Sequence, residues 1–289
     1  MKLALGTVQF SQNYGIANKR GMIPYNEVQE ILKYSNEAGI NTLDTAISYG
    51  DCETILGSVG VDSWQVISKL PEIPLNCNDI KRWIVETVKS SLNKLNVPQL
   101  HALLLHRPKL LLEDNGDIIY QTLNELKEKK LIKNIGISIY EANELESIIN
   151  NYKVDIVQVP FNLMDHRLIE SGLLAKMASS NIEVHVRSIF LQGLLLMNNE
   201  NRPKKFNFWK NNWNKYDQWL KVNGLTPLQA CLKFVSSFSE IEKIVVGVDH
   251  ICHIKQIVEA YKVETNLTPV RFNSDDLNLL NPSNWINIK

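Results

Sequence analysis

Short apolar or β-branched runs alternate with amphipathic segments along the whole chain. Several of these runs are continuously apolar, which is typical of strands that are buried on both faces of a parallel sheet. The pattern predicts eight strands, over residues 3–8, 41–44, 66–68, 102–105, 134–138, 156–159, 183–187 and 243–246.

Helical periodicity fills the intervals between the predicted strands. The predicted helices are a segment between Pro24 and Gly39, residues 52–59, a segment capped by Asp79, and residues 118–129, 142–152, 168–180, 227–238 and 252–261. Strands that alternate with helices form a parallel α/β sheet. Eight such units in 289 residues favour a closed (β/α)8 TIM barrel over an open doubly wound sheet. Because we find no linker or repeat, we expect a single domain over residues 1–289.

One long segment interrupts the alternation, between the seventh strand and the helix that follows. Residues 198–223 are polar and rich in Lys, Trp, Phe and Tyr. In a barrel, this connection lies on the C-terminal face, where active sites form. Two interpretations stay open: a surface loop with a short helix, or a substrate lid whose cations attract an anionic group.

The charge balance narrows the class of protein. Lys plus Arg and Asp plus Glu both number 31, so the chain lacks the basic excess of a nucleic-acid binder. No apolar run approaches the roughly 20 residues of a membrane span, and the first ten residues do not form a signal peptide. The scattered cysteines form no C-x-x-C pair, which is typical of reduced thiols. We therefore expect a cytoplasmic protein that binds a small molecule, with no nucleic-acid or membrane partner; the oligomeric state is not indicated.

Four ionisable side chains follow consecutive predicted strands at their carboxyl ends. Asp44 ends the second strand, Tyr49 lies in the loop after it, Lys69 ends the third strand and His106 ends the fourth. Each residue alone has an ordinary structural explanation, as a cap, a packed ring or a solvated rim residue. Together they lie where a barrel places its active site, so they are candidate catalytic residues.

These residue types fit the reduction of a carbonyl group. The developing alkoxide needs a proton donor, and an unperturbed tyrosine has a pKa of about 10. A nearby ammonium lowers that pKa, so we expect Lys69 to activate Tyr49 and Asp44 to orient Lys69 as an ion pair. His106 is expected to hydrogen-bond the carbonyl oxygen.

The chain resembles the aldo/keto reductase family in a series of stretches that run in order through the sequence. The most specific part is the set of Asp44, Tyr49, Lys69 and His106, which the resemblance implies to be a catalytic tetrad with Tyr49 as the acid. The other matching stretches are Leu5-Gly6-Thr7, residues 39–46, Leu105-His106-Arg107-Pro108, Gly136-Ile137-Ser138, residues 157–162 and residues 192–195.

The resemblance also implies a nicotinamide cofactor and an aldehyde or ketone substrate, sugar-derived or anionic. NADP(H) is the family's usual cofactor and the preferred expectation here, and NAD(H) is the alternative. The absence of G-x-G-x-x-G after the first strand fits, because this family does not bind its cofactor in the Rossmann way. The implied cofactor contacts are Gly6, Thr7, Asp44, Ser138, Gln158, Arg187, Phe190, Leu191, Gln192, Gly193, Gly247 and His253.

Two departures from the family pattern lie near the expected nicotinamide. Ile139 stands where the family commonly has Asn, which removes one partner of the nicotinamide amide. Arg187 stands where an aromatic residue usually stacks on the nicotinamide. A guanidinium plane can also stack, and its charge can reach an anionic substrate.

A third departure lies at the expected adenosine end. Asp249 would repel a 2′-phosphate, whereas His250 and His253 would attract one if protonated, and Ile257 replaces the family's Asn. We do not expect a metal at His250, Cys252 and His253, because no fourth ligand is suitably spaced.

Two other functions stay open at this point. A Schiff-base lyase or aldolase would use Lys69 as its nucleophile. A non-catalytic regulatory subunit would keep the barrel and its cofactor without turnover.

Overall fold

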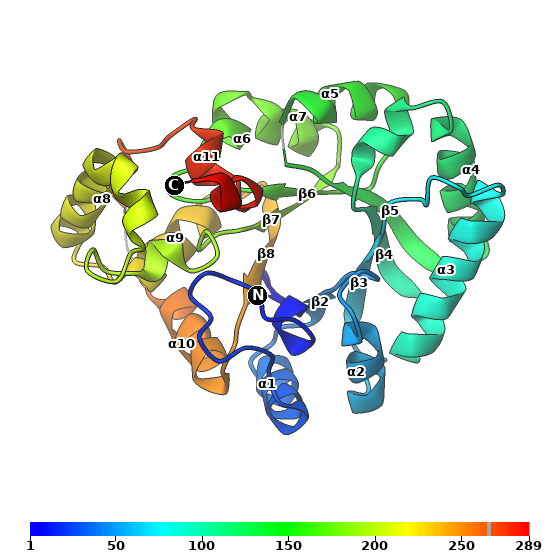
Figure 1. Ribbon diagram of the computed structural model, residues 1–289, viewed down its shortest axis with the longest axis horizontal. Coiled ribbons are helices and arrows are strands. Elements are labelled where there is room, and N and C mark those ends of the chain that lie inside the picture. Colours follow the sequence, from blue (N-terminus) through cyan, green and yellow to red (C-terminus); the bar gives the residue numbers. More distant parts are fainter. Residues whose placement is uncertain (141, 265–266, 289) are drawn as a thin grey trace.

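Eight parallel strands form a closed barrel, with helices on its outside (Figure 1). The computed structural model describes residues 1–140, 142–264 and 267–288. Each strand pairs with the next in sequence, and the last closes on the first through Leu3–Ile244 to Gly6–Gly247. The strands are β1 (Leu3–Gly6), β2 (Thr42–Asp44), β3 (Gln65–Leu70), β4 (Leu100–Leu105), β5 (Ile132–Ser138), β6 (Ile156–Pro160), β7 (Glu183–Arg187) and β8 (Ile241–Gly247).

The helices pack against the outer face of the barrel. Asp79 caps α3 as predicted, because its side chain accepts a hydrogen bond from the Arg82 amide at 2.9 Å. No helix in the described parts of the chain is long and apolar enough to cross a membrane. The helices are α1 (Tyr25–Glu37), α2 (Cys52–Val59), α3 (Ile80–Leu95), α4 (Gly116–Glu128), α5 (Ala142–Asn151), α6 (Arg167–Glu170), α7 (Leu173–Ser179), α8 (Lys210–Asn223), α9 (Pro227–Ser236), α10 (Ile251–Lys262) and α11 (Leu277–Leu280).

The predicted barrel is confirmed, and two local predictions are corrected. The first strand ends at Gly6 instead of Val8, because Val8–Phe10 forms a short 3-10 helix, η1. The single helix predicted over residues 168–180 is wrong. Gly172 adopts a left-handed φ of +74°, which ends α6 and starts α7 in a new direction.

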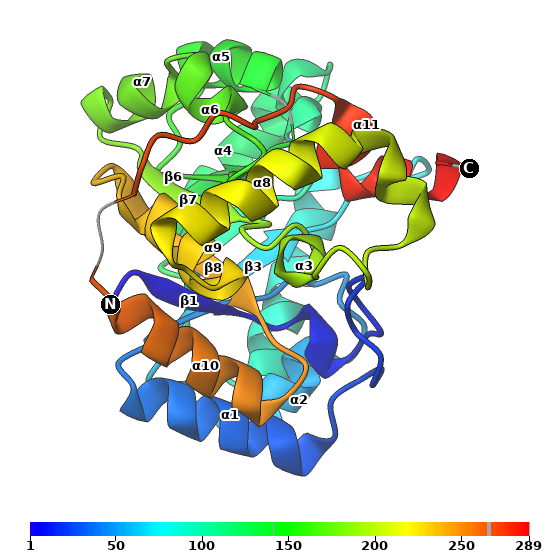
Figure 2. The ribbon, with the colours of Figure 1, turned by 90° about the vertical axis from the view of Figure 1, so that its left-hand side faces the viewer.

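The segment 198–223 is mostly helical rather than a loop. It forms the 3-10 helix η4 (Lys204–Trp209) and then α8, which lies beside the C-terminal segment (Figure 2). Trp213 and Tyr216 are buried on the inner side of α8. The Trp219 indole donates to the Thr268 carbonyl at 3.1 Å, and the Trp209 indole donates to Asp276 at 3.0 Å. This segment and the C-terminal residues therefore share a small core outside the barrel.

Alternation along the strands explains how polar side chains reach the C-terminal end of the barrel. Ile67, Leu104 and Ile156 belong to an apolar cluster of buried barrel-strand residues. Side chains two residues apart on a strand point the same way. Lys69, His106 and Gln158 therefore lie one layer above this apolar cluster.

Candidate active site

A cavity of about 350 Å³ opens at the C-terminal ends of the strands. This volume falls in the range of small-molecule sites. All four candidate catalytic residues line it, and so do the expected cofactor residues except Leu191. Among the candidates, the lining residues are Gly6, Thr7, Asp44, Tyr49, Lys69, His106, Ser138, Gln158, Arg187, Phe190, Gln192, Gly193, Gly247 and His253.

A buried ion pair lies at the floor of this cavity. The Lys69 Nζ is 2.7 Å from Asp44 Oδ1 and donates to the Thr45 carbonyl at 2.9 Å. The Gln158 amide donates to the other oxygen of Asp44 at 2.7 Å, and the Ser138 hydroxyl donates to Gln158 at 3.2 Å. Lys69 is 2% exposed and Asp44 5% exposed, so neither charge is compensated by bulk water. This chain of contacts fixes four side chains from four strands.

Tyr49 lies in the loop between β2 and α2, above the ion pair. Its backbone amide donates to the Ala46 carbonyl at 3.0 Å, and its carbonyl accepts from the Ser11 hydroxyl. The Lys69 Nζ is 5.5 Å from the centre of the Tyr49 ring. The Tyr49 and His106 rings meet edge to face, with centroids 6.3 Å apart. The four candidate catalytic side chains thus form one cluster.

The pKa of Tyr49 differs from the sequence-based expectation. Burial raises the pKa of Tyr49 most, the Asp44 carboxylate raises it further, and Arg187 lowers it. The expected net lowering by Lys69 is therefore wrong, because Lys69 is paired with Asp44 and the phenol is shielded from water. The Tyr49 phenol stays protonated near neutral pH and is available as a proton donor.

His106 is neutral at physiological pH. Burial is the main cause, and together with the charges of Lys69 and Arg187 it lowers the pKa of His106 to about 4, against the raising effect of Asp44. A neutral imidazole has one N–H, which can donate a hydrogen bond to a carbonyl oxygen.

The lowered pKa of His106 predicts acid sensitivity. Between the folded pKa of about 4 and an unfolded value of about 6.5, the unfolded chain binds more protons, so stability should fall as pH decreases through this window. Urea unfolding at pH 7.5 and pH 5 should show a larger loss for wild type than for His106→Gln. An equal loss in both proteins would show that His106 is not the titrating group.

The far end of the cavity, beside α10, carries an acidic group. The Asp249 carboxylate is 2.5 Å from His253 Nδ1. His250 acts as the cap of α10, because its Nδ1 accepts from the Cys252 amide at 3.0 Å. The Arg20 guanidinium forms an ion pair with the Glu27 carboxylate at 3.2 Å. In the described chain, the Lys and Arg residues that line the cavity are Lys69 and Arg187, both at the opposite end.

Two loops approach closely over the middle of the cavity. Gln192 and Gly193, after β7, both have positive φ, and a Cβ on Gly193 would lie 2.4 Å from the Ala17 Cβ. Only glycine therefore permits this contact with the loop after β1. The Leu191 side chain is 0% exposed and packs into the hydrophobic core, so any cofactor contact of this residue would come from its backbone.

Sequence reasoning missed several residues of the cavity, among them Gln9, Tyr14, Asn18 and Tyr140. They lie in the connections after β1 and β5, where no motif marks them. Tyr140, two residues after the end of β5, was the available signal. None of residues 198–223 lines the cavity within the described ranges, so the lid interpretation gains no support from its position.

Known proteins are similar to this chain in sequence. An uncharacterised oxidoreductase of Bacillus subtilis (strain 168) is 28% identical over 187 residues, which are 59% of this chain and 58% of that protein. The NADH-specific methylglyoxal reductase of Escherichia coli (strain K12) is 27% identical over 183 residues, 56% of either chain. The matches therefore span somewhat more than half the length of these relatives.

Solved structures share the fold. An aldo-keto reductase of Bacillus halodurans, in its holo form, superposes with a TM-score of 0.76 at 19% identity, over 92% of this chain and 88% of the other. The glycerol dehydrogenase of Gluconobacter oxydans gives a TM-score of 0.71 at 21% identity, over the same shares. The sequence model described as the aldo/keto reductase family matches residues 2–274. This chain therefore belongs to the aldo/keto reductase family of oxidoreductases.

Proposed function

We propose that this oxidoreductase reduces an aldehyde or ketone to the alcohol with a nicotinamide cofactor, and that Tyr49 is the general acid. The observation that carries the proposal is the buried cluster of Asp44, Lys69, Tyr49 and His106 at the floor of one cavity. A protonated phenol and a neutral imidazole both face the space where a carbonyl oxygen would lie.

The residues present fit a bound nicotinamide nucleotide. Ser138 and Gln158 offer a hydroxyl and an amide beside the catalytic cluster, and Gln9 Oε1 is buried in the lining without a hydrogen-bond partner. The loop at Gln192–Gly193 and the end of the cavity at Asp249 and His253 would hold the rest of the molecule. When bound, the cofactor supplies the hydride for the carbonyl carbon.

The side chains divide the remaining work. His106 hydrogen-bonds the carbonyl oxygen and orients it. As the carbon accepts hydride, the electron pair of the carbonyl bond moves to oxygen, and Tyr49 transfers its proton there. An alkoxide is more basic than a phenolate, so Tyr49 can donate despite its raised pKa. Lys69 lies near the phenolate that remains, which takes its next proton from solvent.

The ion pair of Lys69 counts against the Schiff-base alternative. A nucleophilic lysine must be neutral, whereas Lys69 contacts the Asp44 carboxylate at 2.7 Å.

Turnover itself separates the proposal from a non-catalytic subunit. Purified protein should oxidise NADH or NADPH when it is tested with a panel of small aldehydes and ketones. The reaction is followed as the loss of cofactor absorbance. Tight cofactor binding with no turnover across the panel would favour the regulatory interpretation.

We further propose that NADH is the preferred cofactor, in place of the family's usual NADPH. Asp249 places a carboxylate at the adenosine end, where no lining Lys or Arg of the described chain compensates a 2′-phosphate. The similar Escherichia coli reductase is named as NADH-specific. The His253 ring lies against the Asp249 carboxylate, with Nδ1 2.5 Å from Oδ1.

Cofactor preference gives a direct prediction. In fluorescence titrations, NADH should bind at least about tenfold more tightly than NADPH, a difference of about 1.4 kcal/mol. Asp249→Asn should narrow this gap by improving NADPH binding, while Glu259→Gln, an exposed change on α10, should leave it unaltered. Tighter binding of NADPH to wild type would contradict this proposal.

A further inference from the structure

Arg187 is a cation in the cavity without an acidic partner. Its guanidinium donates to the Ile139 carbonyl at 3.0 Å and to the Ser188 hydroxyl at 3.3 Å. No described carboxylate lies within ion-pair distance of it, whereas Lys69 is matched by Asp44. A guanidinium has five N–H donors, so several remain available.

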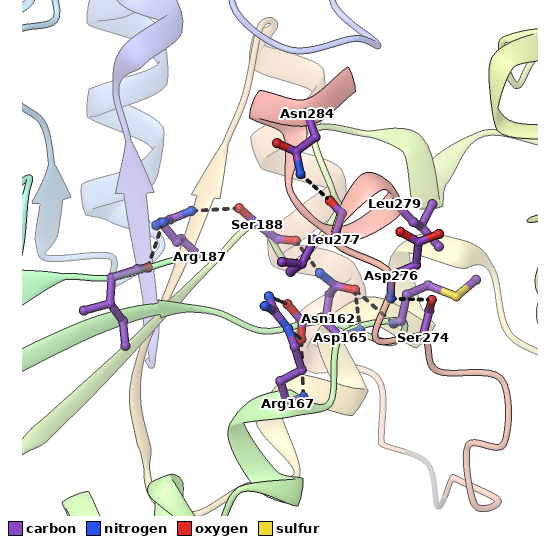
Figure 3. A network of polar contacts seen from close by, with 12 residues as sticks. Asn162, Asp165, Arg167, Arg187, Ser188, Ser274, Asp276, Leu277, Leu279 and Asn284 are labelled. Atoms are coloured by element: carbon purple, nitrogen blue, oxygen red, sulfur yellow. Dashed lines mark hydrogen bonds and ion pairs between the residues drawn. The ribbon is translucent and has the colours of Figure 1, made fainter. Parts of the chain in front are cut away.

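The position of this guanidinium is fixed by its neighbours (Figure 3). It lies 4.2 Å above the Tyr140 ring. The next residue, Ser188, has a positive φ of 59°, and its carbonyl accepts from the Asn162 amide at 3.2 Å. Asn162 in turn accepts from the Met164 amide at 2.9 Å, and the Met164 carbonyl accepts from the Ser274 amide at 2.8 Å. The strand end that carries Arg187 is thus tied to the C-terminal segment, which limits the cost of ordering it on binding.

The charge of Arg187 acts on the catalytic residues. It lowers the pKa of Tyr49 and of His106, although burial dominates in both groups. With His106 neutral, Lys69 and Arg187 outnumber Asp44 at this end of the cavity. An anion bound there would restore the charge balance and compensate the partly buried guanidinium.

We propose that Arg187 binds an anionic oxygen group of the substrate, a carboxylate or a phosphate close to the carbonyl. This inference rests on the proposed carbonyl reduction and specifies its substrate class. Arginine binds such groups through two parallel N–H bonds. The Tyr14 hydroxyl accepts from the Gln192 amide at 3.2 Å, which leaves its own hydrogen free for the same anion. The Tyr140 ring lies against the guanidinium, and Tyr14 lines the same cavity.

The test compares matched pairs of charged and neutral substrates. D-glyceraldehyde 3-phosphate is paired with D-glyceraldehyde, and succinic semialdehyde with butanal. We expect wild type to favour at least one anionic member, and Arg187→Gln to lower kcat/KM for that member about 10- to 100-fold, the range of a lost charged hydrogen bond. The neutral member should change less than about threefold. Arg187→Lys should recover part of the loss, and Arg82→Gln, on the exposed side of α3, is the control.

The outcomes separate this inference from the proposed function. If wild type prefers the charged member only in the glyceraldehyde pair, the bound group is a phosphate. If it prefers the charged member only in the semialdehyde pair, the bound group is a carboxylate. If Arg187→Gln lowers kcat/KM equally for both members of each pair and weakens NADH binding, Arg187 contacts the cofactor and the inference is wrong. If wild type reduces neither charged nor neutral compounds, the proposed function fails first and the inference fails with it.

Discussion

Replacing Tyr49 by phenylalanine is expected to lower kcat about 10²- to 10⁴-fold, the usual contribution of a general acid. The substitution removes the proton donor and keeps the ring that packs against His106. Because the phenol acts on the substrate oxygen, the dissociation constant of NADH should remain nearly the same. Steady-state kinetics and fluorescence titration of the same preparation measure both quantities.

Tyr25→Phe is the control for this experiment. It removes an exposed phenol at the start of α1, outside the cavity. Its kcat should stay close to the wild-type value. Wild-type kcat in Tyr49→Phe would show that another group donates the proton.

Replacing Lys69 by methionine is expected to reduce both activity and stability. The ammonium is 2% exposed and forms the ion pair with Asp44, so its loss leaves a buried carboxylate with Gln158 as its main partner. Breaking a buried ion pair from one side costs about 3 kcal/mol or more. Urea unfolding measures this loss, and the pH–rate profile shows whether the acid is perturbed as well.

The double variant Asp44→Asn with Lys69→Met separates the two effects. Removing both charges should restore part of the stability, because no buried charge remains unpaired. Activity should stay low, since the phenolate left on Tyr49 has lost its neighbouring cation. An unchanged pH–rate profile in Lys69→Met would contradict the role given to Lys69 in catalysis.

The barrel was predictable because its signal is local. Each strand is a short apolar run, and the periodicity of the helices identifies their buried sides. The break at Gly172 depends on one left-handed residue within a helical pattern, which the pattern does not reveal. The fold of residues 198–223 depends on distant partners: Tyr216 packs against Phe272, 56 residues later, with ring centroids 5.5 Å apart.

The catalytic cluster was predictable for a related reason. Asp44, Lys69 and His106 follow consecutive strands, and a parallel barrel brings such positions to one edge. The pKa of Tyr49 was not predictable, because burial dominates it and burial is a property of the folded chain. Tyr14 and Tyr140 were missed because their loops have no periodic pattern that relates them to the cavity.

The most direct test of carbonyl reduction follows deuterium from labelled cofactor to product. Enzyme is incubated with NADH deuterated at both C4 positions and the best substrate of the panel, and the alcohol is analysed by mass spectrometry. We expect alcohol with one deuterium on the former carbonyl carbon from wild type, and almost no alcohol in the same time from Tyr49→Phe that still binds NADH. Alcohol without deuterium, or no NADH binding by wild type, would contradict this expectation.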